Sequence, residues 1–413
     1  MNSKHYSRDF ILVILGQIIS LFGNAVLHFA LPLYLLRETG SPALFGLVTA
    51  CSFLPMVLLS FLGGVLADRV NKQRIMVFLD FLTAAIVLVL ALILGKVPLV
   101  PLVTAALMLL YGIAGTYQPA VQASIPALVD QSRILSAGAI VSQVGALAGL
   151  LSPVLGGILF GAFGIMPILI LSIFCFAASA VMELFIRIPF TRRNNSAGVL
   201  TILRSDFRDS AHYIRAEKPV LLKIIVLVAL FNLVLSAMLI VGLPILVVQT
   251  LCLSDGLLGF AQGALALGGL CGGIATAALG ERLKLSGAPL LLLLCSLLVG
   301  LMALPLLAGV PPMVSYAVLT AACFFIMALA TMFSVQMMAA VQRETPPELV
   351  GKVMALMLSI SLCAQPLGQA LYGALFGAFP QNTGVILCCV AALSAVISLS
   401  AKKVFCGDFA QSK

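Results

Sequence analysis

Residues 64–74 read Gly-Val-Leu-Ala-Asp-Arg-Val-Asn-Lys-Gln-Arg and join two apolar segments, residues 44–67 and 75–95. A helix needs about twenty mostly apolar residues to cross the hydrocarbon layer of a membrane. The neighbouring segments are long enough to do so, whereas the connector is short and carries four charged side chains. The stretch therefore indicates a tight turn at a membrane surface, between two spanning helices.

The rest of the chain continues this alternation of apolar segments and charged connectors. Of its 413 residues, 62% are hydrophobic and 9% are charged, a balance typical of a protein whose solvent is lipid. We predict an all-α membrane protein with twelve transmembrane helices. The predicted helices cover residues 10–36, 44–67, 75–95, 99–123, 134–161, 165–186, 220–248, 256–280, 288–309, 313–338, 353–379 and 383–404.

Composition and motifs exclude several classes of protein. The net charge of +9 is not gathered into a basic stripe beside stacking aromatics, and Trp is absent, so we expect no nucleic-acid partner. The ten Cys residues lack the spacing of a metal site. The sequence has no His-Glu-x-x-His, no Gly-x-Ser-x-Gly and no Walker-type phosphate loop. We therefore expect neither an enzyme nor an ATP-driven pump, and no metal or cofactor.

Lysine and arginine are distributed unevenly between the two ends of the predicted helices. Of the 23 basic residues, only Arg37 and Lys96 lie on the side opposite the N-terminus. Basic residues are enriched in the cytoplasmic loops of membrane proteins. The asymmetry therefore predicts a multi-pass protein of the bacterial cytoplasmic (inner) membrane with both termini in the cytoplasm.

The two halves of the chain resemble each other at an offset near 213 residues. Residues 66–69 (Leu-Ala-Asp-Arg) correspond to residues 279–282 (Leu-Gly-Glu-Arg), and Leu-Phe-Gly-Ala-Phe occurs at both 159–163 and 375–379. Parallel repeats of this kind build transporters that bind substrate between their halves. The predicted parts are an N-terminal six-helix bundle (1–188), a cytoplasmic linker (189–218) and a C-terminal six-helix bundle (219–413).

The connector at 64–74 resembles the loop signature of the major facilitator superfamily, a family of transporters built from two six-helix bundles. Gly64 permits close helix approach, Asp68 can cap a helix N-terminus, and the basic residues can pair with carboxylates. Anchoring by the positive-inside rule explains the basic residues but neither Gly64 nor Asp68. The resemblance implies a conformational latch that holds the halves together on the inner side. Its expected members are Gly64, Asp68, Arg69, Lys72, Arg74, Asp80 and Asp130.

A second signature lies in the fifth predicted helix. Residues 148–157 (Ala-Gly-Leu-Leu-Ser-Pro-Val-Leu-Gly-Gly) resemble the antiporter signature of the superfamily, with alanine and serine where glycine is usual. Small residues from Gly145 to Gly156 share one helix face, which predicts a closely packed seam. In this family the signature is associated with exporters. The expected members of the seam are Ala148, Gly149, Ser152, Pro153, Gly156 and Gly157.

Residues 16–33 and 343–353 resemble the macrolide-efflux branch of the superfamily, which contains drug:proton antiporters. The resemblance covers essentially the whole chain. The branch also includes siderophore exporters and other permeases, so the resemblance does not identify the substrate. Many proton-coupled relatives have an arginine in the fourth helix, but here Met108 stands near that place. Coupling through that arginine is therefore excluded.

In the superfamily, the first, fourth, seventh and tenth helices line a central cavity, so their polar residues are the candidates for contacting substrate. Helical periodicity places these residues on common faces of the first and fourth predicted helices. The resulting cavity is weakly polar and nearly uncharged, which suits an amphiphilic molecule. For any single residue, hydrogen bonding between helices is an equally good interpretation. The candidates are Gln17, Asn24, His28, Tyr111, Gln118, Gln122, Asn232, Ser236, Tyr316 and Thr320.

Three side chains are candidates for carrying a coupling proton: His28, Asp80 and Glu38. Asp80 and Glu183 are the deepest carboxylates on the inner side, and Glu38 lies near the outer side. His28 is the only imidazole in the predicted helices, although a lone buried histidine is more often simply hydrogen-bonded. If His28 carries the proton, His28→Ala abolishes proton-driven transport without affecting folding.

Together these features predict a monomeric secondary transporter that exports amphiphilic, macrolide-type compounds by proton antiport with alternating access. Its expected partners are a small amphiphilic substrate, protons and membrane lipids. Two alternatives remain open at this point. The chain could export a siderophore or another metabolite, or it could import a lipid or other solute.

Overall fold

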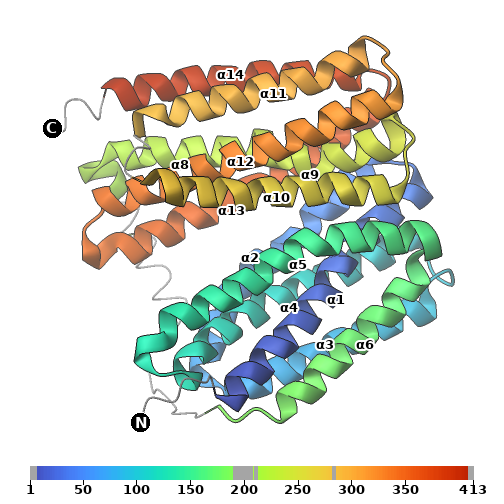
Figure 1. Cartoon of the computed structure of the whole chain (residues 1–413), viewed down its shortest axis with the longest axis vertical. Helices are drawn as coiled ribbons and strands as arrows, with labels where there is room; N and C mark the ends of the chain where they lie inside the picture. The colour runs from blue at the N-terminus through green and yellow to red at the C-terminus, as the bar shows by residue number, and fades with distance from the viewer. Residues whose placement is uncertain (1–6, 189–207, 209–212, 281–284, 408–413) are drawn as a thin grey trace. The chain divides into compact units, whose positions relative to one another are not determined.

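The computed structural model describes residues 7–188, 208, 213–280 and 285–407. Within them, twelve helical segments are long and apolar enough to cross a membrane, which confirms the predicted number. The chain is an all-α, multi-pass membrane protein (Figure 1). The helices of its first half are α1 (Arg8–Thr39), α2 (Pro42–Arg69), α3 (Lys72–Ile93), α4 (Leu99–Leu128), α5 (Ile134–Phe163) and α6 (Ile165–Leu184).

The helices of the second half begin with a composite span, Pro219–Thr250. Its parts are α8 (Pro219–Phe231), a π-helical turn η3 (Asn232–Ser236), α9 (Ala237–Pro244) and a second π-helical turn η4 (Ile245–Thr250). The remaining helices are α10 (Asp255–Leu279), α11 (Ala288–Leu307), α12 (Pro312–Glu344), α13 (Pro347–Ala378) and α14 (Thr383–Gly407). Short 3₁₀ turns, η1 (Gln131–Arg133) and η6 (Leu285–Gly287), precede α5 and α11.

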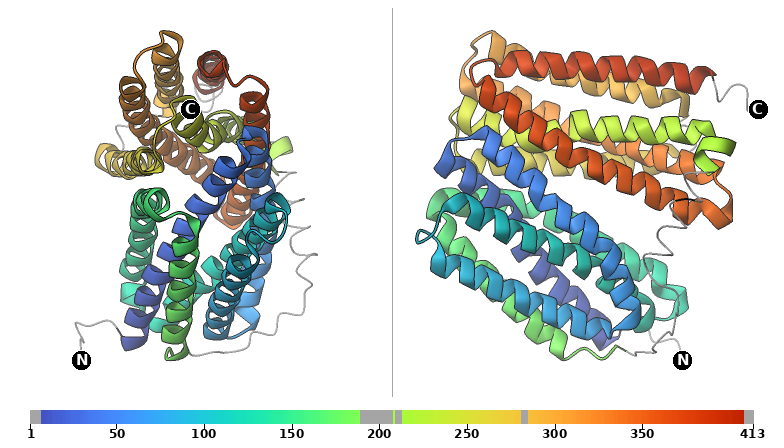
Figure 2. Two further views of the ribbon diagram at one scale, coloured as in Figure 1. Left: turned by 90° about the vertical axis from the view of Figure 1, so that its right-hand side faces the viewer. Right: turned by 180° about the vertical axis from the view of Figure 1, so that it is seen from behind.

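Contacts between residues divide the chain into two compact units. Unit 1 comprises residues 1–40 and 51–196, and unit 2 comprises residues 41–50 and 197–413. In unit 1, α1 packs against α4, α5 and α6, and α3 packs against α4 and α6. In unit 2, α10 and α11 pack against α12, and α11 lies beside α14, as two views show (Figures 1 and 2).

The seventh span is not the uniform α-helix that its apolar sequence predicts. The first π turn starts at Asn232, whose side-chain amide donates a hydrogen bond of 3.0 Å to the Val228 carbonyl. The Asn232 side chain thus supplies a hydrogen-bond donor to a backbone carbonyl one turn earlier, at the point where the backbone hydrogen bonds change from the α-helical to the π-helical pattern. The second π turn follows Pro244, which has no N–H to donate. Such π-helical turns recur at functional sites. The first of the two contains two of the predicted cavity residues, Asn232 and Ser236.

Side chains at the helix ends tie the helices of unit 1 together. The Ser7 hydroxyl accepts a hydrogen bond from Phe10 N at 3.2 Å and donates one of 2.9 Å to the carbonyl of Leu128. The Gln73 amide donates to the carbonyls of Glu183 and Leu184, at 3.1 and 3.0 Å. These bonds satisfy backbone groups that a helix end leaves unpaired. They join the start of α1 to the end of α4, and the start of α3 to the end of α6.

Glycines allow helices to approach closely in both units. In unit 1, a Cβ at Gly63 would lie 2.7 Å from Thr116 Cα, and one at Gly115 would lie 2.6 Å from the Met56 carbonyl oxygen. In unit 2, a Cβ at Gly272 would lie 2.8 Å from Ala328 Cα. These distances are too short for any residue larger than glycine. Small residues therefore set how closely α2 approaches α4 and how closely α10 approaches α12.

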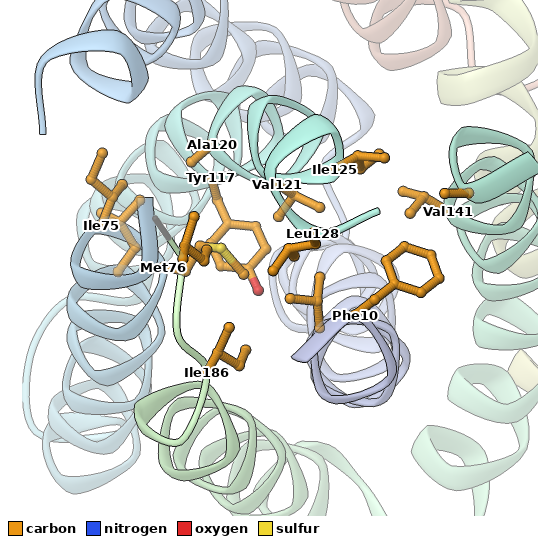
Figure 3. Packing of buried hydrophobic residues seen from close by; sticks show 14 residues of the cluster. Phe10, Ile75, Met76, Tyr117, Ala120, Val121, Ile125, Leu128, Val141 and Ile186 are labelled. Atoms are coloured by element: carbon orange, nitrogen blue, oxygen red, sulfur yellow. The ribbon is translucent and has the colours of Figure 1, made fainter. Parts of the chain in front are cut away.

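A cluster of buried apolar side chains fills one end of unit 1 (Figure 3). We call it the apolar end cluster. It draws on the first turns of α1, α3 and α5, the last turns of α4, and the residues that follow α6. Its members are Phe10, Val13, Ile75, Met76, Leu79, Tyr117, Ala120, Val121, Ile125, Leu128, Ala137, Val141, Ile186 and Ile188.

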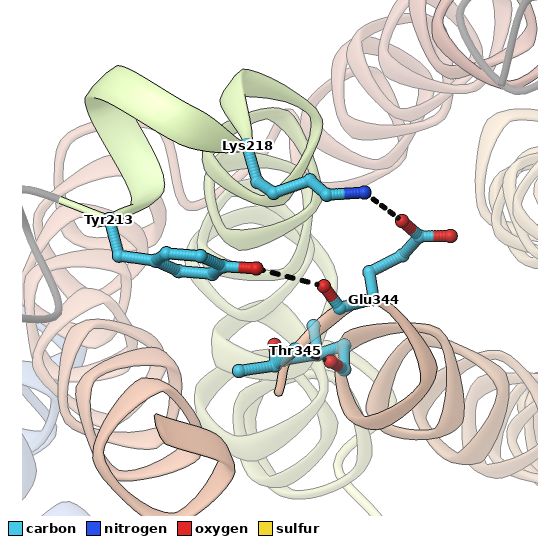
Figure 4. A network of polar contacts seen from close by, with 5 residues as sticks. Tyr213, Lys218, Glu344 and Thr345 are labelled. Atoms are coloured by element: carbon cyan, nitrogen blue, oxygen red, sulfur yellow. Dashed lines mark hydrogen bonds and ion pairs between the residues drawn. The ribbon is translucent and has the colours of Figure 1, made fainter. Parts of the chain in front are cut away.

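The segment before α8 is held against the end of α12 (Figure 4). A π-helical turn (Tyr213–Glu217) precedes Lys218, whose Nζ lies 2.9 Å from the Glu344 carboxylate. The Tyr213 hydroxyl donates a 3.1 Å hydrogen bond to the Glu344 carbonyl. Most of the predicted linker, residues 189–207 and 209–212, lies outside the described residues.

Replacing Lys218 by methionine should lower the free energy of unfolding of unit 2 by less than about 1 kcal/mol, because exposed ion pairs contribute little. The side chains of Lys218 and Glu344 are 40% and 25% exposed. The Glu344 carboxylate raises the pKa of Lys218. Since the folded-state pKa lies above the unfolded value, the contribution is complete at neutral pH and disappears only as the pH rises through the folded-state value. Thermal melts at pH 7 measure it, and a loss well above this figure would contradict the prediction.

Candidate functional site

Asp80 lies in the interior of unit 1, in the third turn of α3. Its side chain is 2% exposed, and its Oδ1 accepts a 3.0 Å hydrogen bond from the Ser20 hydroxyl on α1. The predicted latch paired Asp80 with the basic residues of the 64–74 connector. In the structure the Asp80 side chain lies inside the bundle, where the Ser20 hydroxyl is its hydrogen-bond donor, so its place in the latch stays a prediction. Its other oxygen, Oδ2, is buried without a hydrogen-bond partner.

A second carboxyl, that of Glu183, ends a chain of three buried side chains. The Gln17 amide on α1 donates to the Tyr117 hydroxyl on α4 at 2.8 Å, and this hydroxyl donates to Glu183 Oε1 on α6 at 2.6 Å. Gln17 and Glu183 are both fully buried. Gln17 was predicted to line the substrate cavity, but it lies in this internal network instead. Gln17 Oε1 and Glu183 Oε2 have no hydrogen-bond partner.

The sequence did not identify this network, although it identified Glu183 as one of the deepest carboxylates. Ser179, one turn before Glu183, donates a 3.1 Å hydrogen bond to the Gly16 carbonyl on α1. A Cβ at Gly16 would lie 3.5 Å from Glu183 Cγ, so the glycine leaves room for the carboxyl. The spacing of serine and glutamate on α6 was the available signal. Its partners on α1 and α4 follow only from the packing of three helices.

The polar network forms a layer between the apolar end cluster and a small cavity. On α1, Phe10 and Val13 precede Gln17, and Asn24 follows it. On α4, Tyr117 belongs both to the apolar end cluster and to the lining of the cavity. The part of the cavity that can hold the centre of a water molecule has a volume of about 30 Å³, which is room for one or two waters. The polar side chains that line the cavity are those of Ser20, Asn24, Asp80, Thr83, Tyr117 and Gln118.

Two predicted cavity residues are brought together in an aromatic group further along α1 and α4. The rings of His28 and Tyr111 meet edge to face with centroids 3.9 Å apart. Phe53 on α2 lies against Tyr111 at 5.6 Å. Phe53 was missed by the sequence analysis, because polar residues were the criterion and an aromatic residue in an apolar helix gives no periodic signal. His28 Nδ1 is buried without a hydrogen-bond partner.

The remaining predicted cavity residues are one on α4 and four in unit 2. Gln122 is exposed on α4. In unit 2, Asn232 and Ser236 lie in the first π turn, and the Tyr316 hydroxyl on α12 donates a 2.9 Å hydrogen bond to the Leu257 carbonyl on α10. The Thr320 hydroxyl, one turn beyond Tyr316, is buried without a partner.

The structure describes the side chains of only some of the other members of the predicted latch. Gly64, Asp68 and Arg69 lie on α2, but outside the residues whose side chains the structure describes. Lys72 is half-buried at the start of α3, whereas Arg74 and Asp130 are exposed. Glu38, a candidate proton carrier, is also exposed, near the end of α1.

The predicted seam on α5 is closely packed only in its C-terminal half. Ser152, Gly156 and Gly157 are buried, and a Cβ at Gly156 would lie 3.0 Å from the Phe29 ring on α1. Pro153 lies inside the helix, and Ala148 is half-buried. By contrast, a Cβ at Gly145 or Gly149 would meet nothing within 4 Å. Close packing therefore accounts for Gly156 but not for the two earlier glycines.

Comparison with known families and proteins adds three findings. A family model described as "Major Facilitator Superfamily" matches residues 13–368. Macrolide efflux protein A of Streptococcus pyogenes is 26% identical over 176 residues. That alignment covers 42% of this chain and 43% of the relative, so less than half of either chain is compared. The same values hold for the protein of this name from serotype M6 of that species.

Solved structures with the same fold cover nearly the whole chain. The nucleoside transporter NupG superposes with a TM-score of 0.75 at 13% identity, covering 97% of this chain and 99% of that one. A bacterial homologue of the iron transporter ferroportin, in an inward-facing state, gives a TM-score of 0.73 at 17% identity, covering 96% and 98%. At such low identity these likenesses show the fold alone.

Proposed function

The chain belongs to the major facilitator superfamily of transporters, and from this premise we propose that it exports amphiphilic, macrolide-type compounds in exchange for protons. The observation that carries the substrate class is the uncharged, aromatic group of His28, Tyr111 and Phe53 in unit 1. A large apolar ligand is held by surface contact with such rings and by a few hydrogen bonds. The partial similarity to macrolide efflux protein A supports the same class.

The charges of the helices that carry this aromatic group also favour a neutral or amphiphilic substrate. Helix α4 has no Asp, Glu, Lys or Arg, and α1 has none between Asp9 and Arg37. A small anion or a sugar phosphate in the membrane interior requires a nearby cation. The polar groups offered here are the amides of Asn24 and Gln118 and the ring of His28, which can hydrogen-bond a ligand without attracting an ion.

A proton gradient is the energy source that this proposal requires. The sequence has no Walker-type phosphate loop, so an ion gradient is the simplest remaining source. Unit 1 contains buried carboxyls that can change protonation state, which supports the proton over other ions. We place both termini in the cytoplasm, because the basic residues are concentrated on that side. Export then proceeds by alternating access in a monomer.

Transport by the purified full chain tests the proposal directly. In proteoliposomes with an imposed pH gradient, labelled erythromycin is expected to move against its concentration gradient and to stop when a protonophore collapses the pH gradient. Counterflow without a gradient measures the same carrier independently of the driving force. Uptake in the direction of proton flow would indicate an importer instead. Transport of a siderophore but of no macrolide would support the alternative exporter.

Two substitutions at His28 separate a role in the aromatic group from a role in proton transfer. We expect His28→Phe to retain pH-driven transport, because a phenyl ring can keep the edge-to-face contact with Tyr111. We expect His28→Ala to weaken apparent substrate affinity several-fold, because the ring contact is lost. Transport rates at several substrate concentrations measure both effects. Loss of pH-driven transport in His28→Phe with counterflow intact would instead make His28 the proton carrier.

A further inference from the structure

Asp80 and Glu183 are buried carboxyls without a counter-ion. In the part of the chain that the structure describes, neither carboxyl has a Lys, Arg or His partner. Their hydrogen-bond donors are the neutral hydroxyls of Ser20 and Tyr117. An isolated ionised carboxylate in an apolar interior costs far more free energy than a neutral one. Two such charges in one network repel each other as well, so the pair cannot readily carry both.

Hydrogen bonding distinguishes the two oxygens of each carboxyl. Asp80 Oδ1 accepts from Ser20, and Glu183 Oε1 accepts from Tyr117. The second oxygens, Asp80 Oδ2 and Glu183 Oε2, are buried and have no partner. A buried polar atom without a partner is expensive and calls for an explanation. A bound proton lowers this cost, because a neutral carboxyl is less expensive to bury than a charged one.

The groups that surround the pair come from four helices. Helix α1 contributes Gln17 and Ser20, which do not titrate in the accessible pH range. Helix α3 contributes Asp80, α4 contributes Tyr117, and α6 contributes Ser179 and Glu183. The titratable groups in the described network are therefore two carboxyls and one phenol. The phenol links Glu183 to Gln17 and also borders the cavity beside Asp80.

The cavity connects this pair with the residues proposed to meet substrate. Asp80 and Tyr117 share its lining with Asn24 and Gln118, and its size allows one or two waters. On the opposite side, the apolar end cluster covers the network. A proton can thus approach from the side of the cavity, whereas the apolar end cluster covers the pair on the other side.

We propose that Asp80 and Glu183 form one proton-binding site, with Tyr117 and Ser20 as its neutral hydrogen-bond donors, and that this site carries the proton exchanged for substrate. Proton uptake forms an O–H bond at Asp80 Oδ2 or Glu183 Oε2 and breaks one O–H bond of a hydronium ion in the cavity, which leaves water. No electrons are transferred. The charge of the pair changes by one, beside the cavity that Asn24 and Gln118 also line. This inference deepens the proposed function, because it identifies the site of proton coupling.

Infrared difference spectroscopy of the full chain in lipid tests the site without any substrate. The carbonyl stretch of protonated carboxyls is expected to change with pH in the unmodified protein. Glu183→Gln and Asp80→Asn should each remove one contribution and displace the pH at which the other titrates. Asp255→Asn is the matched control, since Asp255 lies at the start of α10 in unit 2, outside the network, and it should leave these bands unchanged. Unaltered bands in both buried-site variants would overturn the proposal.

Transport measurements then connect the site to coupling. Both variants should lose accumulation driven by a pH gradient, down to the level of empty liposomes, while retaining substrate counterflow. Full pH-driven accumulation in either variant would overturn the proposal. If Glu183→Gln fails to fold, Glu183→Asp replaces it and should keep the titrating band at a shifted pH. An unshifted band in that variant would also count against the site.

The two proposals can fail separately. If the unmodified protein moves no macrolide but its infrared bands depend on Asp80 and Glu183, the proton site stands and the substrate class is wrong. If it transports macrolide with the pH gradient while the infrared bands are the same in the Asp80 and Glu183 variants as in the unmodified protein, the substrate class stands and the site is wrong. Manganese is the probe for a competing metal site. Loss of the carboxyl bands on adding Mn²⁺, in the unmodified protein only, would replace the proton by a divalent cation.

Discussion

Replacing Tyr117 by phenylalanine is expected to destabilise unit 1 by about 1–3 kcal/mol, the cost of leaving buried polar groups unpaired. The Tyr117 hydroxyl accepts a 2.8 Å hydrogen bond from the Gln17 amide and donates one of 2.6 Å to the Glu183 carboxyl. Its removal leaves the Gln17 amide and the Glu183 carboxyl without this partner. The phenylalanine ring preserves the packing in the apolar end cluster. The loss therefore reports the hydrogen bonds rather than the shape of the side chain.

The same substitution should alter the pH dependence of transport. Tyr117→Phe removes the hydrogen-bond donor of the Glu183 carboxyl, so the pH at which transport is fastest should differ from that of the unmodified protein. Tyr34→Phe is a matched control, because Tyr34 is a half-buried tyrosine on α1 outside the network. Thermal melts and pH–rate profiles of the two variants provide the comparison. Identical profiles for Tyr117→Phe and the unmodified protein would argue against its role beside the proton site.

Replacing Gly272 by leucine should prevent stable folding of unit 2. Helices α10 and α12 cross with Gly272 against the Ala328 backbone, where a Cβ would lie 2.8 Å from Ala328 Cα and 2.9 Å from its carbonyl carbon. Gly268, one turn earlier, lies against the backbone of Phe324 in the same way. Neither backbone can yield as a flexible side chain does. We expect destabilisation of about 3 kcal/mol or more, the upper range for overpacking.

The neighbouring Gly273 provides the control for this effect. A Cβ at Gly273 would meet nothing within 4 Å, so Gly273→Leu adds the same volume at a position where the Cβ has open space. Fluorescence-detected size-exclusion chromatography of the two variants compares their yields of monodisperse protein. Equal yields would show that α10 and α12 do not depend on this close approach.

The sequence predicts the helices well because hydrocarbon imposes a strict length on them. Every spanning segment must pair its own backbone groups, so apolar runs and charged connectors determine where helices begin and end. The seventh span is the exception in detail. Its composition indicates a single α-helix, but the side chain of Asn232 and the missing N–H of Pro244 accompany two π-helical turns. Such local changes depend on individual hydrogen bonds that a pattern of hydrophobicity does not record.

The candidate site was predictable only in its residue types. The sequence singled out Gln17, Asp80 and the depth of Glu183. It assigned Gln17 to the substrate cavity, and it assigned Asp80 both to the latch and to the candidates for carrying the coupling proton. Residues at 17, 80, 117 and 183 belong to four helices. Only the packing of those helices forms the hydrogen-bonded groups Gln17–Tyr117–Glu183 and Ser20–Asp80 and brings the two carboxyls close enough to interact. Helical periodicity reports which face a residue shares within its own helix. It does not report which neighbouring helix that face meets.

The apolar end cluster has a consequence for energy conservation. If water reached Glu183 from both ends of unit 1, protons would run through the bundle without any cargo and discharge the gradient. Phe10, Leu128 and Ile186 belong to the seal that closes one end. A polar residue introduced there, for example Leu128→Asn, would let protons leak through unit 1 without transport of substrate.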